Sequence, residues 1–367
     1  MDPQELPPLG LTQGVPPAAL VGPEELARAA GIDEILRLGS NESPFGPSPK
    51  AWVAMERSLN DAHRYGDPSE HDLRGAIAAR HGVTPAAVTL GAGVDDLLGL
   101  AVRAFLAPGM TAITSLGGFP TFEMHAHGFQ ARIVKVPYHA NASVDLDGLL
   151  DAARQADGSI VYLANPDNPT GSWYGRTRIA QLVAALPKRT LVIHDEAYAN
   201  FLPAAERYPE GQPDARVIRM RTFSKEYGMA GLRVGYAVAA PPVIAAFDAI
   251  RLLYGVSRVA QAGALASLQD DGFVADVVAR IEEGRADYVA LGAELGLPAF
   301  PSSANFVLFG CGTAARAKRC LDQLLTHGIH IRKPPAPPLD HCIRISVGTP
   351  EQRRRLAKSL RTIVRVL

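Results

Sequence analysis

Short apolar runs alternate with helical patterns through the middle of this chain, and that alternation restricts the folds it can adopt. The runs include TAITSL, SIVYLANP, TLVIHDEAY, RVIRMRTF and RVGYAVAA. Several of them are continuously apolar, which is expected of strands that are covered on both faces. Strands of this kind, alternating with helices, predict an α/β fold with a mostly parallel sheet covered by helices.

The C-terminal part of the chain has a different pattern. It contains three predicted strands, ANFVLFGC, GIHIRK and CIRISVG, and a predicted helix, AARAKRCLDQLLTHG, between the first two. A last helix is expected where Thr349 is a good N-cap and Gln352 completes a capping box. The pattern predicts a smaller α+β lobe. We therefore expect a large domain over residues 46–254 and a small domain formed by residues 1–45 and 255–367.

The composition argues against several classes of protein. Lysine plus arginine and aspartate plus glutamate both number 37, so no basic excess indicates a nucleic-acid partner. The cysteines Cys311, Cys320 and Cys342 are odd in number and lack CxxC spacing, so neither a disulfide framework nor a metal site is expected.

The sequence offers no candidate for a targeting or membrane-spanning segment. Residues 1–14 are acidic and proline-rich rather than cationic and apolar, so no signal peptide is expected. The longest apolar window, YAVAAPPVIAAF, is interrupted by prolines and is too short for a membrane span. We expect a soluble cytoplasmic protein without a membrane partner.

Polar side chains follow several predicted strands at their carboxyl ends, where open α/β sheets bind their ligands. These side chains are Asn165, Asn168, Asp195, Tyr198, Ser224 and Lys225. In addition, GAGVDD, residues 91–96, follows the run VTL and opens a helix. We expect these groups to meet at one edge of the sheet.

Each of these features has a simpler interpretation when it is taken alone. GAGVDD lacks the third glycine of a dinucleotide-binding fingerprint and is equally consistent with a tight strand–helix turn. Asp195 is explained by a helix N-cap, NPDNPTG by a turn, and Lys225 by a surface position. The combination is less expected by chance, because it meets the needs of one cofactor.

That cofactor is pyridoxal phosphate, which needs a lysine amine to hold its aldehyde and an acid to keep its ring nitrogen protonated. Lys225 supplies the amine and Asp195 the carboxylate. Tyr198 and Asn168 are candidates to bond the ring hydroxyl.

The cofactor phosphate is predicted to bind at the helix that GAGVDD opens, because a helix N-terminus presents unpaired amides and a positive dipole end. The residues of this helix start are Gly93, Val94, Asp95 and Asp96. Ser224 and Arg233 complete the predicted cradle, Arg233 with a fixed positive charge.

The motifs NPDNPTG, DEAY and SKEYGMAGLRVGY resemble those of the fold-type-I pyridoxal-phosphate aminotransferases, and most of all those of the histidinol-phosphate aminotransferase family. LGSNESPFGPSPKA, HRYGDP, GFPTFEMH and IRISVGTPEQ support the resemblance, in the right order from about residue 24 to about residue 352. The resemblance implies a transaminase of histidine-biosynthesis type, which exchanges an amino group between a small-molecule amino donor and 2-oxoglutarate.

Further roles follow from the resemblance. Phe122 falls where the family stacks an aromatic ring on the cofactor, and Tyr65 where a tyrosine reaches the cofactor phosphate of the neighbouring subunit, which implies a homodimer. Arg344, helped by Asn168, falls where the family binds the substrate α-carboxylate.

Two more substrate residues are implied, although solvated arginines are an alternative explanation for Arg332 and Arg344. Arg332 is a candidate for a second substrate anion such as a phosphate, and Asn41 matches a substrate-side loop. The chain also departs from the family: GVPPAALVGPEELARAAG lacks the tyrosine that reaches the substrate phosphate, and Gly255 in YGVS replaces an asparagine. These departures concern the choice of amino donor.

Four alternatives stay open. The nearest is an aromatic amino-acid aminotransferase on the same scaffold, favoured by the missing N-terminal tyrosine, and the second is a decarboxylase of the same fold. A DNA-binding regulator that keeps the cofactor would need an extra basic N-terminal domain, for which the segment before the first matched motif leaves no room. A nicotinamide dehydrogenase based on GAGVDD leaves Lys225 and NPDNPTG unexplained.

Overall fold

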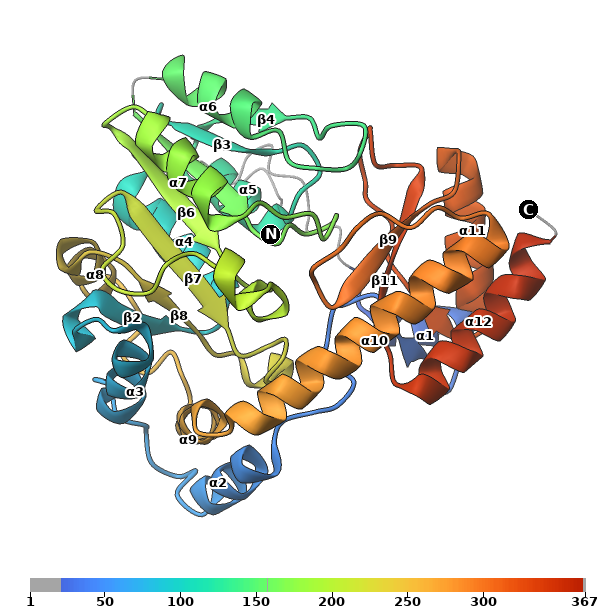
Figure 1. Ribbon diagram of the computed structural model, residues 1–367. Coiled ribbons are helices and arrows are strands. Elements are labelled where there is room, and N and C mark those ends of the chain that lie inside the picture. Colours follow the sequence, from blue (N-terminus) through green and yellow to red (C-terminus); the bar gives the residue numbers. More distant parts are fainter. Residues whose placement is uncertain (1–20, 157, 366–367) are drawn as a thin grey trace, which may run out of the picture.

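The computed structural model describes residues 21–156 and 158–365. Its centre is a seven-stranded sheet in the order β2-β8-β7-β6-β5-β3-β4 (Figure 1). The strands are β2 (Val88–Gly91), β3 (Thr111–Ser115), β4 (Arg132–Val136), β5 (Ser159–Ala164), β6 (Thr190–Asp195), β7 (Val217–Thr222) and β8 (Gly235–Val238). Only β8 runs antiparallel to its neighbours in this sheet, so the prediction of a mostly parallel α/β sheet is confirmed.

Helices cover both faces of this sheet, which explains the continuously apolar runs. On one face, α4 (Val94–Phe105), α5 (Pro120–Gly128) and α8 (Pro241–Asp248) pack on alternate strand residues such as Ile160 and Tyr162. On the other face, α6 (Leu146–Arg154) and α7 (Arg176–Ala185) pack on the intervening residues Val161 and Leu163. Successive strand side chains point to opposite faces, so both sets must be apolar.

A third group of helices packs beside the β2 end of the sheet (Figure 1). It consists of α2 (Pro49–Leu59), α3 (His71–His81) and α9 (Arg258–Leu268). Single turns of 3-10 helix link the other elements: η3 (Pro85–Ala87), η4 (Ala199–Phe201), η5 (Ala204–Glu206) and η6 (Ala230–Leu232). The apolar window YAVAAPPVIAAF is divided between the end of β8 and α8.

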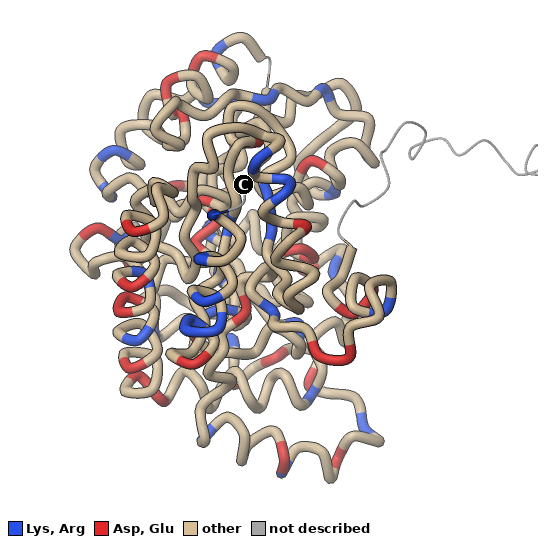
Figure 2. The backbone as a smooth tube through the Cα atoms, turned by 90° about the vertical axis from the view of Figure 1, so that its right-hand side faces the viewer, with Lys and Arg blue, Asp and Glu red and all other residues tan. Residues whose placement is uncertain are grey.

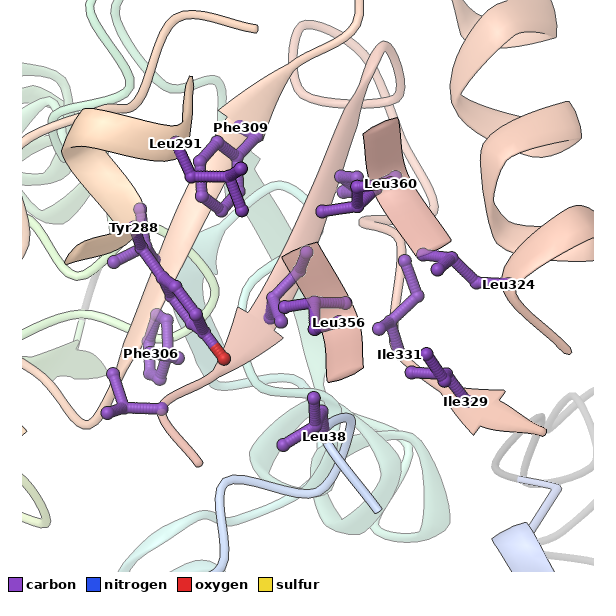
Figure 3. Close-up of a cluster of buried hydrophobic side chains, with 14 of the residues drawn as sticks. Leu38, Tyr288, Leu291, Phe306, Phe309, Leu324, Ile329, Ile331, Leu356 and Leu360 are labelled. Carbon is purple, nitrogen blue, oxygen red and sulfur yellow. The ribbon is translucent and has the colours of Figure 1, made fainter. Parts of the chain in front are cut away.

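The small lobe is built on two short strand pairs. β9 (Phe306–Gly310) pairs antiparallel with β11 (Cys342–Ser346), and β1 (Leu36–Arg37) pairs parallel with β10 (Ile329–His330). The helices of this lobe are α1 (Pro23–Ala30), α10 (Asp271–Leu295), α11 (Ala314–Thr326) and α12 (Pro350–Val364). Figure 3 shows apolar side chains of α10, α11 and α12 packed with Leu38 from the N-terminal part of the chain.

The strands and helices predicted for the C-terminal part of the chain are all present in this lobe. The three predicted strands are β9, β10 and β11, the helix between the first two is α11, and Thr349 and Gln352 form the expected capping box of α12. The long α10 runs from the neighbourhood of α9 to the small lobe (Figure 1). The division into 46–254 and the flanking segments stays a prediction.

The charged residues, the helix lengths and the cysteines of the described residues can be compared with the predictions from composition. Acidic and basic residues are interspersed along the chain (Figure 2). Of the helices in the described part, none is both long and apolar enough to cross a membrane. Within the described ranges, no group of three or more His, Cys, Asp or Glu residues is arranged to hold a metal ion. Cys311, Cys320 and Cys342 are buried free thiols. Residues 1–14, for which no signal peptide is expected, lie outside the described residues.

Candidate active site

A cavity of about 780 Å³ lies between the carboxyl edge of the large sheet and the small lobe. It brings together residues that are far apart in the sequence. Of the residues that the sequence motifs single out, it is lined by Asn41, Val94, Asp95, Asn168, Asp195, Tyr198, Ser224, Lys225, Arg233, Arg332 and Arg344.

Lys225 lies in the turn that follows β7. Its Nζ is 5.5 Å from the centre of the Tyr198 ring. The turn is braced by Thr222, whose Oγ1 accepts a hydrogen bond from the Ser224 N–H at 3.1 Å and donates to Ser224 Oγ at 2.9 Å. Gly228 closes the turn with φ +68°, and a Cβ at this position would overlap the Gly46 carbonyl oxygen. The local backbone therefore presents Lys225 to the cavity.

Asp195 is the last residue of β6 and is buried. Its Oδ2 accepts a hydrogen bond from the Tyr162 hydroxyl at 2.7 Å, and its Oδ1 accepts from the Ala197 N–H at 3.0 Å. Burial raises the pKa of this carboxyl, although both hydrogen bonds oppose the shift. A buried carboxylate of this kind is stabilised by a nearby cation. The protonated ring nitrogen of pyridoxal phosphate would be such a cation.

Tyr198 follows Asp195 on the next turn and is held by the N-terminal part of the chain. Its hydroxyl accepts a hydrogen bond from Asn41 Nδ2 at 3.0 Å. Asn41 is anchored in the small lobe, because its N–H donates to Ser346 Oγ at 2.9 Å and its carbonyl oxygen accepts from Asn305 Nδ2 at 2.9 Å. Asn41 has φ 55°, a left-handed conformation that asparagine tolerates better than most residues.

The helix start predicted to hold a phosphate is the N-terminus of α4, capped by Gly93. Gly93 has φ +86°, and a Cβ there would lie 2.5 Å from Arg233 Nη2, so this position requires glycine. Val94 and Asp95 line the cavity beside Arg233. Asp96 does not line it, because its Oδ2 accepts a hydrogen bond from the Ala92 N–H at 2.9 Å and closes the turn.

Arg344 lies on β11 and lines the cavity. Its Nη2 donates to the Gly39 carbonyl at 2.7 Å and its Nη1 bonds Asn168 Oδ1, whereas Nε has no hydrogen-bond partner among the described residues. Burial lowers the pKa of its guanidinium to about 10. A buried cation with a free donor is suited to bind an anion.

Arg332 lies next to Arg344, because the two residues form an antiparallel bridge. Its Nη2 donates to the Val21 carbonyl at 2.9 Å, and burial lowers its pKa. Both arginines therefore line the small-lobe wall of the same cavity.

Besides Gly93 and Asp96, two more residues with predicted cofactor roles do not line this cavity. Phe122 is fully buried on α5 and stacks on Tyr162, a cavity-lining residue, with ring centres 5.3 Å apart. Tyr65 is 76% exposed and stacks on Tyr254 with ring centres 4.4 Å apart. Their roles in stacking on the ring and in binding across a subunit interface stay predictions.

Sequence reasoning missed Tyr162 and the pair formed by Tyr138 and Asp167. Tyr138 donates from its hydroxyl to Asp167 Oδ1 at 3.1 Å, beneath the loop that carries Asn168. A tyrosine inside an apolar strand run such as SIVYLA is a usable signal, because a buried phenol needs a hydrogen-bond partner. The identity of that partner depends on which strand lies alongside.

The residues present fit pyridoxal phosphate. An amine, a buried carboxylate, a phenol and an arginine-flanked helix start all face one cavity, which are the groups this cofactor requires. The fold and this site define a fold-type-I aminotransferase. The chain belongs to the class I and II aminotransferase family, which matches residues 33–360.

Relatives within the family are similar over most of their length. Histidinol-phosphate aminotransferase 2 of Ralstonia nicotianae is 38% identical, with 89% of each chain covered, and the histidinol-phosphate aminotransferase of Roseiflexus castenholzii is 38% identical, with 95% of each covered.

Two solved aminotransferase structures are similar to this chain. The histidinol-phosphate aminotransferase of Sinorhizobium meliloti, in complex with pyridoxal-5'-phosphate, is 41% identical with a TM-score of 0.94, over 98% of this chain and 97% of that one. Aspartate aminotransferase of Thermus thermophilus shares the fold at 22% identity and a TM-score of 0.82, over 97% of this chain and 98% of that one.

Proposed function

We propose that this chain is a pyridoxal-phosphate-dependent aminotransferase that transfers the amino group of histidinol phosphate to 2-oxoglutarate. The observation that carries the proposal is one cavity lined by an amine, Lys225, a buried carboxylate, Asp195, and two arginines, Arg332 and Arg344. The named relatives, which act on histidinol phosphate, support the choice of donor.

Each cofactor contact is assigned to a residue of this chain. Lys225 holds the aldehyde carbon, Asp195 the ring nitrogen, and Tyr198 and Asn168 the ring hydroxyl. The phosphate is assigned to the α4 N-terminus with Ser224 and Arg233. Pyridoxal phosphate, when bound, supplies an aldehyde that exchanges amines and a ring that withdraws electrons from the bond being broken.

Lys225 has a second assigned task. Once the substrate amine has displaced it, Lys225 Nζ takes the proton from the substrate Cα and later returns a proton, as a general base and acid. Tyr198 lies against this amine, 5.5 Å from ring centre to Nζ, and limits the positions that Nζ can occupy. With the cofactor bound, the Asp195 carboxylate would hold the ring nitrogen and favour its protonated form.

The two arginines explain how one site takes two different anions. Histidinol phosphate carries a phosphate ester and no α-carboxylate, whereas 2-oxoglutarate carries two carboxylates. Arg344 offers the unpaired Nε and its neighbour Arg332 adds a second guanidinium on the same wall. Guanidinium groups bind both carboxylate and phosphate oxygens in bidentate fashion.

We also propose that the enzyme is a cytoplasmic homodimer in which Tyr65 reaches the cofactor phosphate of the second subunit. Large exposed apolar side chains support this. Tyr254 stacks on Tyr65, and Leu252 and Leu253, which precede Tyr254 in the chain, are exposed as well. Contiguous exposed apolar patches mark sites of protein–protein interaction. A monomer at micromolar concentration in sedimentation velocity would contradict this part of the proposal.

An aromatic amino-acid aminotransferase is the second candidate. The observation that favours it is the absence of tyrosine from GVPPAALVGPEELARAAG, where the family carries a phosphate-binding tyrosine. In an aromatic aminotransferase Arg344 would bind the carboxylate of the amino donor, and Arg332 would face no second anion on that donor.

The deciding experiment follows the visible absorption of the cofactor-loaded protein as histidinol phosphate, phenylalanine or glutamate is added without an acceptor. Histidinol phosphate is expected to bleach the band at the lowest concentration. If phenylalanine does so instead, the aromatic assignment replaces the present one. Lys225→Ala is expected to lose the band and the activity, whereas Lys50→Ala, at an exposed lysine, keeps both. A fully active Lys225→Ala enzyme would refute the mechanism.

A further inference from the structure

A buried group of charged residues lies on the two chain segments that carry Asp195 and Lys225. On β7, Arg219 and Arg221 point to the side of the sheet opposite Ile218 and Met220, which pack toward α4 and α8. Glu196, the residue after Asp195, lies between them. Its Oε1 and Oε2 accept from Arg219 Nε and Nη2 at 2.8 and 3.0 Å, and Oε2 also accepts from Arg221 Nε at 2.6 Å.

These contacts tie together the strand ends from which the site is built. Glu196 follows the last residue of β6, and its N–H donates to the Met220 carbonyl on β7 at 2.8 Å. Arg221 precedes the turn that carries Ser224 and Lys225. A displacement of the Glu196 carboxylate would therefore move both Asp195 and the start of the lysine turn.

The group contains two arginines and two carboxylates. A second carboxylate, Glu210, lies 3.2 Å from Arg219 Nη1 and 3.7 Å from Arg221 Nη2, so two arginines face two carboxylates. Burial opposes ionisation of Glu196, but Arg221 and Arg219 hold its pKa well below the usual range. Other titratable groups also face this group. His194 Nδ1 lies 3.1 Å from Glu196 Oε1, and His81 Nδ1 lies 2.5 Å from Glu210 Oε2. The groups that face Arg221 include Tyr236, Tyr227, His81, Arg207 and Glu226.

Stability alone is a weak reason for such a group. Arg219 and Glu196 are almost completely buried, and the desolvation of two such ions offsets most of their attraction, so apolar side chains would pack there at similar stability. Apolar side chains cannot form hydrogen bonds of 2.6 to 3.0 Å between the end of β6 and β7. They also cannot place a fixed charge there.

We propose that Glu196 and Arg221 are positioning residues, which hold Asp195 and Lys225 in register and set the charge on the two segments that carry them. This inference rests on the proposed function for its cofactor, but it does not depend on the identity of the amino donor. It assigns a task to two residues that do not line the cavity.

The first test is Glu196→Gln, which keeps the shape of the side chain and removes its charge. Arg219 and Arg221 then face only one carboxylate, that of Glu210. The excess positive charge lowers the pKa of the Lys225 nitrogen that would hold the cofactor. The pH midpoint of the visible absorption of bound pyridoxal phosphate is expected to fall by about half a pH unit or more. The turnover number kcat is expected to fall about tenfold, with KM changed less than about twofold.

A second variant separates charge from geometry and guards against misfolding. Arg221→Lys keeps the positive charge but loses the planar guanidinium group. The pH midpoint of the visible absorption should therefore stay unchanged while kcat falls. The matched control is Glu210→Gln, which removes a carboxylate from the same arginines at a half-exposed position away from the strand ends. Solvent screens that position, so its midpoint should move by less than about 0.2 unit.

The outcomes decide the inference separately from the proposed function. If Glu196→Gln lowers the unfolding temperature but leaves the midpoint and kcat as in the wild type, Glu196 is structural only and the inference is wrong. Equal midpoint shifts in Glu196→Gln and Glu210→Gln would also overturn it. The midpoint requires only bound cofactor, whereas failure of the proposed function appears as wild-type protein that does not react with histidinol phosphate.

Discussion

The side-chain amide of Asn41 donates a hydrogen bond to the Tyr198 hydroxyl over 3.0 Å, although 157 residues separate the two in the chain. Asn41 is itself held by Ser346 on β11. A residue that precedes the large sheet therefore connects a tyrosine at the end of β6 with the strand that carries Arg344. This contact connects the large-sheet wall of the cavity with its small-lobe wall.

Replacing Asn41 by alanine should weaken both sides at once. The Tyr198 hydroxyl and Ser346 Oγ lose a buried partner, which costs about 1–3 kcal/mol of unfolding free energy. We expect kcat/KM to fall about tenfold, because Tyr198 is no longer held. Ser346→Ala is the control: it removes the anchor but leaves Asn41 bonded to Tyr198, so it should reduce stability more than activity. Urea unfolding and steady-state kinetics test both variants.

Gly93→Ala should damage cofactor binding through a steric contact. The new Cβ would lie 2.5 Å from Arg233 Nη2 and displace the guanidinium from the α4 N-terminus. We expect the dissociation constant of pyridoxal phosphate to rise about tenfold or more. Gly109→Ala is a matched control, because Gly109 has a similar φ of +83° and no atom within 4 Å of its Cβ. Equal losses of cofactor affinity in both variants would show that backbone strain, not Arg233, is responsible.

Arg344→Gln should act on substrates rather than on the cofactor. It removes a buried cation and its free Nε donor, so we expect KM for both the amino donor and the 2-oxo acid to rise about 100-fold. The visible absorption of bound cofactor should stay unchanged. Arg344→Lys keeps the charge without the fork and should recover only part of the loss. An unchanged KM for both substrates in Arg344→Gln would remove Arg344 from the substrate site.

Glu226 should make the stability depend on pH near neutrality. Its Oε1 accepts from Asn200 Nδ2 at 2.6 Å, its Oε2 is unpartnered among the described residues, and burial raises its pKa from 4.5 to about 7. Between these values the folded state keeps a proton that the unfolded state has lost, so the free energy of unfolding falls as pH rises, by about 3 kcal/mol in total.

Glu226→Gln should remove this loss of stability at higher pH. Urea unfolding at pH 5, 6, 7 and 8 is expected to give a flatter profile than the wild type, with the largest gain in stability above about pH 7. Glu34→Gln, at an exposed carboxyl, is the control and should follow the wild type. Parallel profiles for Glu226→Gln and the wild type would mean that Glu226 does not hold its proton in the folded state.

The sequence by itself determined the layers and the cofactor chemistry. Ile160 and Val161 are both apolar because helices cover both faces of their strand. A continuously apolar run in the sequence predicts such a strand. Asp195 and Lys225 could be placed together because the carboxyl ends of parallel strands meet at one edge. These are local patterns combined with a rule of topology.

Only the tertiary structure decided which side chains touch. The bonds from Tyr162 to Asp195 and from Asn41 to Tyr198, and the link between Glu196 and Arg221, join separate segments of the chain. Such contacts depend on strand order, on register and on the face to which each side chain points. Phe122 illustrates this, because the packing of α5 on the sheet turns its ring onto Tyr162 rather than into the cavity. A pattern of residue types specifies burial, whereas the partner in a buried contact is specified only when distant segments pack together.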